Sequence, residues 1–298
     1  MCDNGFRTPH GESQESSIST GKKPHKPFYL PKPYHLLIVR IIIWSAGIMV
    51  LFYLLFTIEE IWRPSNFFTL PDVHFTPSPD ALSEKNFPEK IFLHRVNSLE
   101  RIRYAKSRYA GVEIDVFYHE EGFFDVRHPS THSIALSLDT LLAEVDHPEK
   151  LFYWLDLKNL NSRNKNAAVK ELSIISEKYN ILPNIIIESS QSEHLGVFSS
   201  HGFYTSYYLP TLPPGSHSKR EIKQHMAEII DNLSRSKVNA VSANQTQYEL
   251  ITKYLRGFDI LLWHFSDNPF ALKLRQSKLL ADPHVKILLV EDKSPGYR

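Results

Sequence analysis

Residues 111–128 read GVEIDVFYHEEGFFDVRH, two apolar strand patterns separated by a short polar turn. In the first strand pattern, Glu113 and Asp115 lie two residues apart and share one face, while the aliphatic side chains between and around them share the other. The turn at 119–122 is too short to contain a crossover helix. This stretch therefore predicts a β-hairpin, in which no crossover helix joins the two strands.

Strand patterns recur on both sides of this hairpin, with segments of helical apolar spacing between them at 98–109, 162–179 and 218–237. The other strand patterns are 91–95, 151–158, 184–189, 203–208, 238–243, 258–265 and 285–290. This alternation predicts a mainly parallel α/β domain. A closed (β/α)₈ barrel of the TIM type needs eight strands, so one of the nine is peripheral or misread. We favour an irregular barrel over an open doubly wound sheet, because no Gly-rich phosphate loop follows the first strand.

A long apolar segment precedes this domain. Residues 41–58 contain no charge and no proline, and with 36–40 they are long enough to cross a bilayer as a helix. The sequence therefore predicts a transmembrane helix at 36–58, with a buried core helix and a cleaved signal peptide as the disfavoured alternatives.

The flanks of this segment predict its orientation and the domain organisation. Basic residues precede it and two acids, Glu59 and Glu60, follow it, which places the N-terminus in the cytoplasm and the main domain on the other side. The basic residues are Lys22, Lys23, Lys26 and Lys32 before the segment and Arg40 near its start. We expect a disordered tail at 1–35, a Pro-rich linker at 59–90 and the barrel at 91–298.

Composition excludes several classes of protein. Among 298 residues, 34 Lys and Arg balance 33 Asp and Glu, and the net charge of +1 argues against a nucleic-acid binder. The single cysteine, Cys2, excludes an intrachain disulfide framework and a Cys-based zinc site.

Polar side chains follow the ends of the first four strand patterns: His94, Arg95, Glu113, Asp115, His128, Asp156 and Lys158. Taken singly, each has a plainer explanation as a half-exposed strand, a salt bridge or the start of a loop. Their recurrence at the same end of four strands is the stronger signal, because the carboxyl ends of barrel strands meet at one rim. The pattern predicts one site.

The residue types favour phosphodiester cleavage at that site. Buried carboxylates cost several kcal/mol each unless they are compensated, and a cation held by Glu113, Asp115 and Asp156 would offset that cost. Oxygen-only ligands suit Mg²⁺ or Ca²⁺. His94 and His128 could act as an acid–base pair. Cationic side chains can neutralise charge on a phosphoryl group, a role we expect for Arg95 and Lys158. A glycosidase would have no use for these histidines and cations.

These motifs resemble those of the phospholipase-C-like phosphodiesterase superfamily, specifically the glycerophosphodiester phosphodiesterases. That family has His-Arg on its first strand, Glu-x-Asp on the second, a His after the third and an acid-x-Lys on the fourth. Trp263 resembles a family tryptophan near the end of a late strand. The resemblance covers roughly 91–290, with its specific motifs at 94–158. It implies a barrel, attack by a substrate hydroxyl to give a cyclic phosphate, and a glycerophosphodiester or phospholipid headgroup as substrate.

The sequence also departs from that family. Val96 replaces the glycine of His-Arg-Gly, the Glu-Asn-Thr block is absent, and Asp156 stands where Glu is usual. Its variants at 94–98 and 154–158 resemble the menorin-type branch of the superfamily. Asn97 is either a further metal ligand or, as we favour, the cap of the next helix. Glu188 either adds negative charge near the metal or is a solvated strand end.

Two functions remain open. The first is a membrane-anchored, metal-dependent phosphodiesterase that acts outside the cytoplasm on a small or lipid-derived phosphodiester. The second is a non-catalytic barrel ectodomain for ligand binding or adhesion, which the departures at Val96 and Asp156 motivate.

Overall fold

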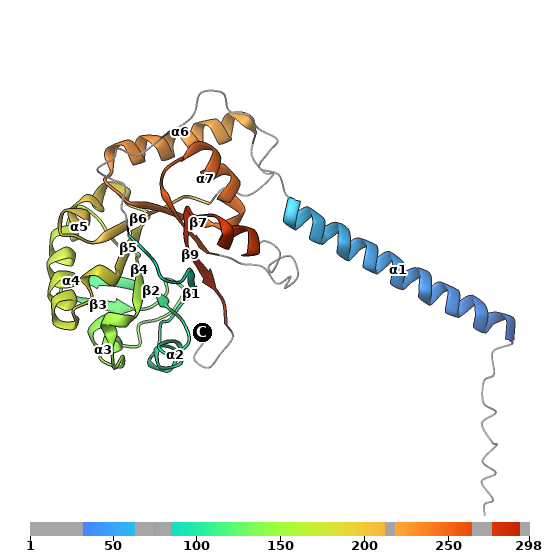
Figure 1. Ribbon diagram of the computed structural model, residues 1–298, viewed down its shortest axis with the longest axis horizontal. Coiled ribbons are helices and arrows are strands. Elements are labelled where there is room, and N and C mark those ends of the chain that lie inside the picture. Colours follow the sequence, from blue (N-terminus) through green and yellow to red (C-terminus); the bar gives the residue numbers. More distant parts are fainter. Residues whose placement is uncertain (1–31, 63–74, 76–84, 212–217, 264–275, 293–298) are drawn as a thin grey trace, which may run out of the picture. The chain divides into compact units, whose positions relative to one another are not determined.

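The computed structural model describes residues 32–62, 75, 85–211, 218–263 and 276–292 (Figure 1). The chain divides into two compact units, Met1–Tyr53 and Leu54–Arg298. The predicted tail up to residue 31 and most of the predicted linker, at 63–74 and 76–84, lie outside the described residues.

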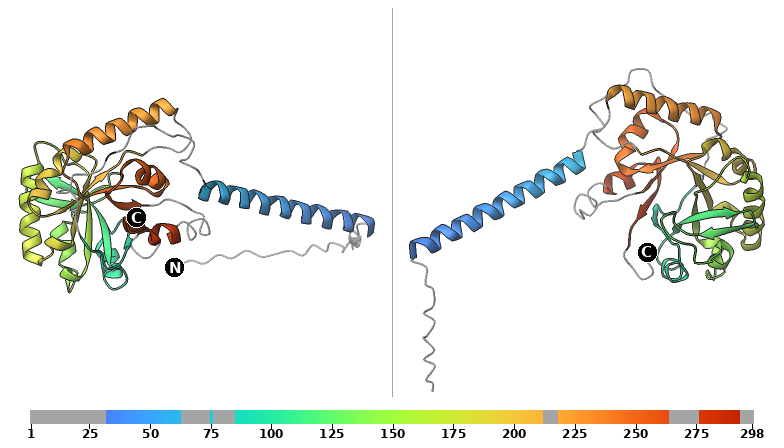
Figure 2. Two further views of the ribbon diagram at one scale, coloured as in Figure 1. Left: turned by 45° about the horizontal axis from the view of Figure 1, so that its top comes forward. Right: turned by 180° about the vertical axis from the view of Figure 1, so that it is seen from behind.

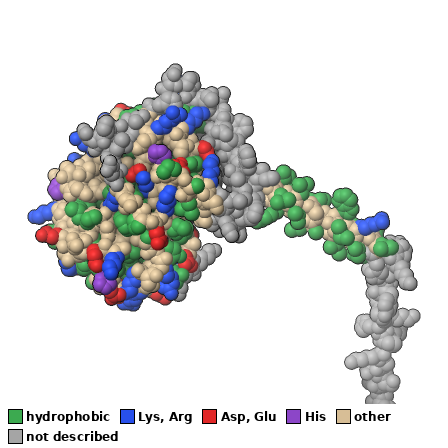
Figure 3. All heavy atoms as spheres, in the orientation of Figure 1, with side chains coloured by type: hydrophobic (Ala, Val, Ile, Leu, Met, Phe, Trp, Pro, Cys, Tyr) green, Lys and Arg blue, Asp and Glu red, His purple; other side chains and the backbone are tan. Residues whose placement is uncertain are grey.

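The first unit contains most of one long helix, α1 (Lys32–Trp62). Its segment Leu36–Leu55 is long and apolar enough to cross a membrane. Large apolar side chains are exposed all along it, including Trp44 and Met49 (Figure 3). A helix without a polar face is not suited to water on any side. α1 is therefore a candidate membrane span, and it includes the predicted segment 36–58.

The second unit is built on a closed parallel barrel, as predicted (Figures 1 and 2). In the described residues the strand order is β1-β9-β8-β7-β6-β5-β4-β2-β3, and a further pairing of β1 with β2 closes the barrel. Among the described strands only β3 is antiparallel, pairing with β2 through the predicted hairpin, so β3 is the peripheral ninth strand. The strands are β1 (Ile91–Leu93), β2 (Gly111–His119), β3 (Phe123–Val126), β4 (Phe152–Leu157), β5 (Ile185–Ser189), β6 (Tyr204–Tyr208), β7 (Ala240–Asn244), β8 (Asp259–Trp263) and β9 (Val285–Val290).

Helices cover the outside of the barrel (Figures 1 and 2). The predicted helical segments correspond to α2 (Leu99–Ala105), α4 (Lys165–Tyr179) and α6 (Lys219–Arg235), of which α2 is shorter than expected. Other described helices are α3 (Leu138–Leu142), α5 (Gly196–Ser200), α7 (Tyr248–Tyr254) and the 3₁₀ turns η3 (Pro148–Lys150), η4 (Leu182–Asn184), η5 (Ser192–His194) and η6 (Gln245–Gln247), and residues 276–281 are also helical. Helix α6 begins with a capping box, in which Ser218 and Glu221 satisfy each other's backbone N–H groups.

The barrel interior is apolar in its N-terminal half. Phe87, from the end of the predicted linker, packs there against Phe92 and Phe152. A side chain at Gly111 would put its Cβ 2.4 Å from the Phe92 ring, so only glycine permits this close packing. Further along the same inward faces, Trp154 is followed by Asp156, and an aliphatic residue of β5 by Glu188. Apolar side chains therefore fill the N-terminal half of the barrel interior, and the polar side chains lie at its C-terminal rim.

Candidate active site

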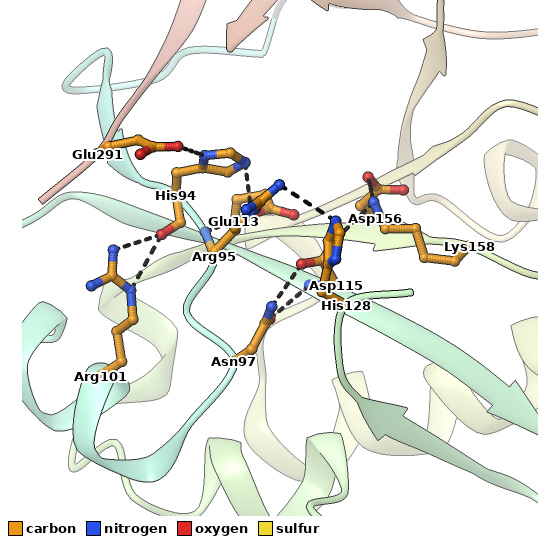
Figure 4. Close-up of polar contacts among 10 residues, drawn as sticks. All are labelled: His94, Arg95, Asn97, Arg101, Glu113, Asp115, His128, Asp156, Lys158 and Glu291. Atoms are coloured by element: carbon orange, nitrogen blue, oxygen red, sulfur yellow. Dashed lines mark hydrogen bonds and ion pairs between the residues drawn. The ribbon is translucent and has the colours of Figure 1, made fainter. Parts of the chain in front are cut away.

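The ends of β1 and β2 bring the first histidine to a carboxylate (Figure 4). The backbone N–H of Arg95 donates to Oε2 of Glu113 at 2.7 Å, and Nε2 of His94 lies 3.7 Å from the same oxygen. Arg95 adopts φ 54°, in the left-handed region that non-glycine residues seldom occupy. Such a conformation persists where surrounding contacts fix it, and it is typical of functional sites.

Asp115 is held by an asparagine. Nδ2 of Asn97 donates to Oδ2 of Asp115 at 2.6 Å, and Oδ1 of Asn97 accepts the backbone N–H of Asp115 at 3.0 Å. The prediction that Asn97 caps the next helix is wrong, because the hydroxyl of Ser98 caps α2 by accepting the N–H of Arg101 at 3.2 Å. Asn97 instead fixes the orientation of Asp115.

Lys158 joins the carboxylates of two strands. Its Nζ lies 2.7 Å from Oδ1 of Asp115 and also forms an ion pair with Asp156. Burial lowers the pKa of Lys158, but the three nearby carboxylates outweigh burial and raise it above its usual value. Lys158 is therefore a permanent cation in this site.

The three predicted metal ligands lie together. Glu113, Asp115 and Asp156 are buried, and each offers one carboxylate oxygen within 4.8 Å of the others. On β5, Glu188 is paired in register with Asp156 and is only 2 % exposed, so of its two predicted alternatives the solvated strand end is wrong. Oε2 of Glu188 is buried and has no hydrogen-bond partner among the described residues.

The cluster has more negative than positive charge. Burial, reinforced by Asp115, raises the pKa of Glu113 well above its usual value. Burial also raises the pKa of Asp156, although Lys158 opposes this, and burial together with Asp156 raises the pKa of Glu188. A divalent cation would stabilise these carboxylates as anions. The all-oxygen donor set and the unpaired Oε2 fit such an ion.

The second histidine comes from outside the barrel wall. His128 follows β3, and its Nδ1 lies 2.6 Å from Oγ of Ser130. Nη2 of Arg95 lies 3.4 Å from Nε2 of His128 and connects it to the β1 end. Burial lowers the pKa of His128, Asp115 partly offsets this, and Arg95 adds to the lowering. The neutral form of His128 is therefore favoured.

These side chains surround one cavity of about 170 Å³. Ten of its lining residues are His94, Arg95, Glu113, Asp115, His128, Asp156, Lys158, Glu188, Trp154 and Trp263. The others are Leu289 and Tyr208, whose ring stacks on Trp263 with centroids 5.9 Å apart. All of the site residues predicted from the sequence line this cavity, except Asn97, which lies behind Asp115. One wall is thus charged and the other is aromatic.

Three site residues were missed by the sequence reasoning. Oε1 of Glu291 lies 3.2 Å from Nδ1 of His94, and Tyr208 lines the cavity. Both come at the C-terminal ends of strands, β9 and β6, where the rim rule could have found them. Arg101 had no such signal. It is fully buried, donates to the His94 carbonyl at 2.9 Å and to the Asp292 carbonyl at 2.9 Å, and so ties β1 to the segment after β9.

No protein-family model matches the chain, and no curated protein is similar to it in sequence. Solved structures do resemble it. A glycerophosphodiester phosphodiesterase from Parabacteroides distasonis is 12% identical with a TM-score of 0.47, over 70% of this chain and 94% of that one. One from Thermotoga maritima is 16% identical with a TM-score of 0.46, over 67% and 92%. A phosphodiesterase from Oleispira antarctica, in complex with the product sn-glycerol-3-phosphate, is 12% identical with a TM-score of 0.45, over 68% and 92%.

Proposed function

We propose that this chain is a metal-dependent phosphoric diester hydrolase. The observation that carries the proposal is one small cavity lined by two histidines, three carboxylates within 4.8 Å of one another, and the cations Arg95 and Lys158. Metal-dependent phosphodiester cleavage uses all three: proton transfer, a held metal ion and neutralisation of phosphoryl charge. Glycerophosphodiesters or phospholipid headgroups are the proposed substrate class.

The two histidines act as the acid–base pair. The lowered pKa of His128 keeps it neutral, so it is ready to accept the proton of an attacking hydroxyl. Glu291 and Glu113 lie on opposite sides of the His94 ring and hold it toward the cavity, where it gives a proton to the leaving oxygen. The roles reverse when water opens a cyclic phosphate. Arg95 reaches from the β1 end toward His128 and binds the phosphoryl oxygens.

Glu113, Asp115 and Asp156 would hold the divalent ion, with Mg²⁺ or Ca²⁺ as the proposed identity. Bound there, the ion would neutralise charge on a non-bridging phosphoryl oxygen. Asn97 keeps Asp115 turned toward the ion, because it holds both the side chain and the backbone of Asp115.

We also propose that α1 anchors the protein in a membrane, with the basic N-terminal flank in the cytoplasm and the barrel on the other side. The support is the apolar segment Leu36–Leu55 and the excess of Lys and Arg before it. An anchored barrel would work close to a lipid surface, which is consistent with a lipid-derived substrate.

The full-length chain in mild detergent can be tested on glycerophosphocholine, glycerophosphoethanolamine and lysophospholipids, with Mg²⁺, Ca²⁺ or EDTA. We expect turnover that EDTA abolishes, and a loss of about 10²-fold or more in His94→Ala and His128→Ala. His147→Ala is the matched control, because this histidine is 67 % exposed beside Glu149. Unchanged turnover in either active-site variant would defeat the proposal.

The non-catalytic binding module remains the second candidate, and one observation favours it. The ammonium group of Lys158 already forms ion pairs with two of the three carboxylates. This candidate predicts no hydrolysis with any divalent ion, and changes in ligand binding when rim residues are replaced.

A further inference from the structure

The ammonium group of Lys158 contacts two carboxylates of the candidate metal site. Its Nζ is 2.7 Å from Oδ1 of Asp115 and is also paired with Asp156. These two acids, with Glu113, form the cluster whose ligand oxygens lie within 4.8 Å of one another. One carboxylate pair therefore has two candidate cationic partners.

Two other partners in this cluster are held more firmly than Lys158. Oδ2 of Asp115 accepts from Asn97, whose own Oδ1 is bonded to the Asp115 backbone, so that this amide is held at both ends. Oε2 of Glu113 accepts the backbone N–H of Arg95 at 2.7 Å. The Arg95 N–H cannot leave without moving backbone, and the Asn97 amide cannot leave without losing both of its hydrogen bonds to Asp115. Lys158 is different, because its ammonium is at the end of a flexible four-carbon chain.

The cavity offers Lys158 a second position, away from the carboxylates. Its side chain is 20 % exposed and lines the same cavity as His94, His128 and Arg95. A phosphoryl group in this cavity would offer new anionic oxygens to an ammonium that leaves the carboxylates.

We propose that Lys158 and a divalent cation are alternative partners of Asp115 and Asp156, and that cation binding releases Lys158 to the phosphoryl group. This inference rests on the proposed function. It gives the site an order of assembly, in which the cation enters first and the phosphodiester second. It also assigns Lys158 two successive anionic partners.

Loss of a residue that helps to bind the cation would weaken cation binding. The proposal predicts the opposite for Lys158, namely that its removal strengthens cation binding. Removing Lys158 removes a positive charge that competes with the cation at close range, so Lys158→Met should bind the cation about tenfold more tightly or better. Lys158→Arg keeps the charge and should bind within about threefold of the natural chain. Lys178→Met removes a surface ammonium that is paired with Asp139, outside the cavity, and should leave the affinity unchanged.

The test is titration of the full-length chain in mild detergent with Tb³⁺, followed by displacement with Mg²⁺. Trp154 and Trp263 line the same cavity and can sensitise Tb³⁺ luminescence without any turnover. Circular dichroism and thermal melting confirm that each variant is folded. Equal or weaker Tb³⁺ and Mg²⁺ affinity in Lys158→Met, or no Tb³⁺ binding in the natural chain, overturns the proposal.

Release of Lys158 can be measured separately by the rate at which an amine-reactive ester labels it, read by mass spectrometry. We expect Mg²⁺ to make labelling of Lys158 several-fold faster and to leave Lys178 unchanged. A rate that stays constant or falls overturns the release step.

If the natural chain hydrolyses phosphodiesters while these tests fail, the proposed function stands and this inference falls. If it hydrolyses none, the function falls, and the Tb³⁺ titration still decides the competition.

Discussion

Oε1 of Glu291 lies 3.2 Å from Nδ1 of His94, although 197 residues separate them in the sequence. The contact spans the seam between β1 and β9, where the backbone N–H of His94 also donates to the Val290 carbonyl at 3.0 Å. Closure of the barrel and orientation of the first histidine thus depend on the same seam.

Glu291→Gln tests this carboxylate. A glutamine keeps the size of the side chain but removes the charge that fixes the His94 ring, so we expect kcat to fall at least tenfold, within the 10²–10⁴ that acid–base catalysis supplies. The thermal midpoint should change little. Glu249→Gln, at a surface pair with Lys278, is the control. Full activity in Glu291→Gln would show that His94 needs no orienting partner.

Arg101→Lys tests the buried clamp behind His94. Nε and Nη2 of Arg101 donate to the His94 carbonyl at 3.3 and 2.9 Å, and Nη1 donates to the Asp292 carbonyl. A lysine cannot reach both carbonyls, so the free energy of unfolding should fall by about 1–3 kcal/mol. We expect kcat to fall with it. Arg103→Lys, on the exposed face of the same helix, should change neither quantity in denaturant titrations and assays.

Glu188→Gln tests the buried carboxylate with the unpaired oxygen. Because burial raises the folded-state pKa of Glu188, its ionised form costs stability at neutral pH, and that cost disappears as pH falls below the unfolded value near 4.5. In EDTA at pH 7.5 we therefore expect Glu188→Gln to be more stable by about 1–4 kcal/mol.

Chemical denaturation of Glu188→Gln across a pH series checks the sign. The gain should shrink toward zero in acid, and Mg²⁺ should reduce it at neutral pH by stabilising the natural chain. Exposed Glu177→Gln is the control. A destabilised Glu188→Gln at pH 7.5 would mean that the carboxylate has a partner that stabilises its charge.

Arg95→Gln tests the environment of His128. Burial is the largest cause of the lowered pKa of His128, and Arg95 lowers it further, so removing the guanidinium should raise that pKa. The acid limb of the kcat/KM profile should then move to higher pH, whatever the loss in absolute rate. NMR titration of the His128 ring measures the same shift directly. Arg163→Gln, at an exposed position, is the control, and a limb that stays in place contradicts the assignment of His128 as the base.

Much of this architecture could be predicted from local sequence. Strand periodicity placed Glu113 and Asp115 on one face, and the short turn after β2 identified the strand that does not close the barrel. The rim rule brought His94, His128 and Lys158 together, because it depends only on where strands end.

What could not be predicted depends on contacts between distant segments. Asn97 was predicted to cap the next helix, because the local sequence shows only that a capping residue is needed there. In the structure Ser98 caps the helix, and the side-chain amide of Asn97 binds Asp115. Nothing in the local sequence distinguishes Arg101 from a surface charge. Its burial follows from two carbonyl groups that meet only when the barrel closes.

The two histidines follow strands that differ in their role in the barrel. His94 follows a strand of the closed barrel, whereas His128 follows β3, whose pairing with β2 adds nothing to closure. A change confined to His128 and the loop after β3 would therefore remove the proposed base and leave the barrel strands and their carboxylates in place. On the proposed function, an enzyme and a binding protein with this barrel would differ by that one loop.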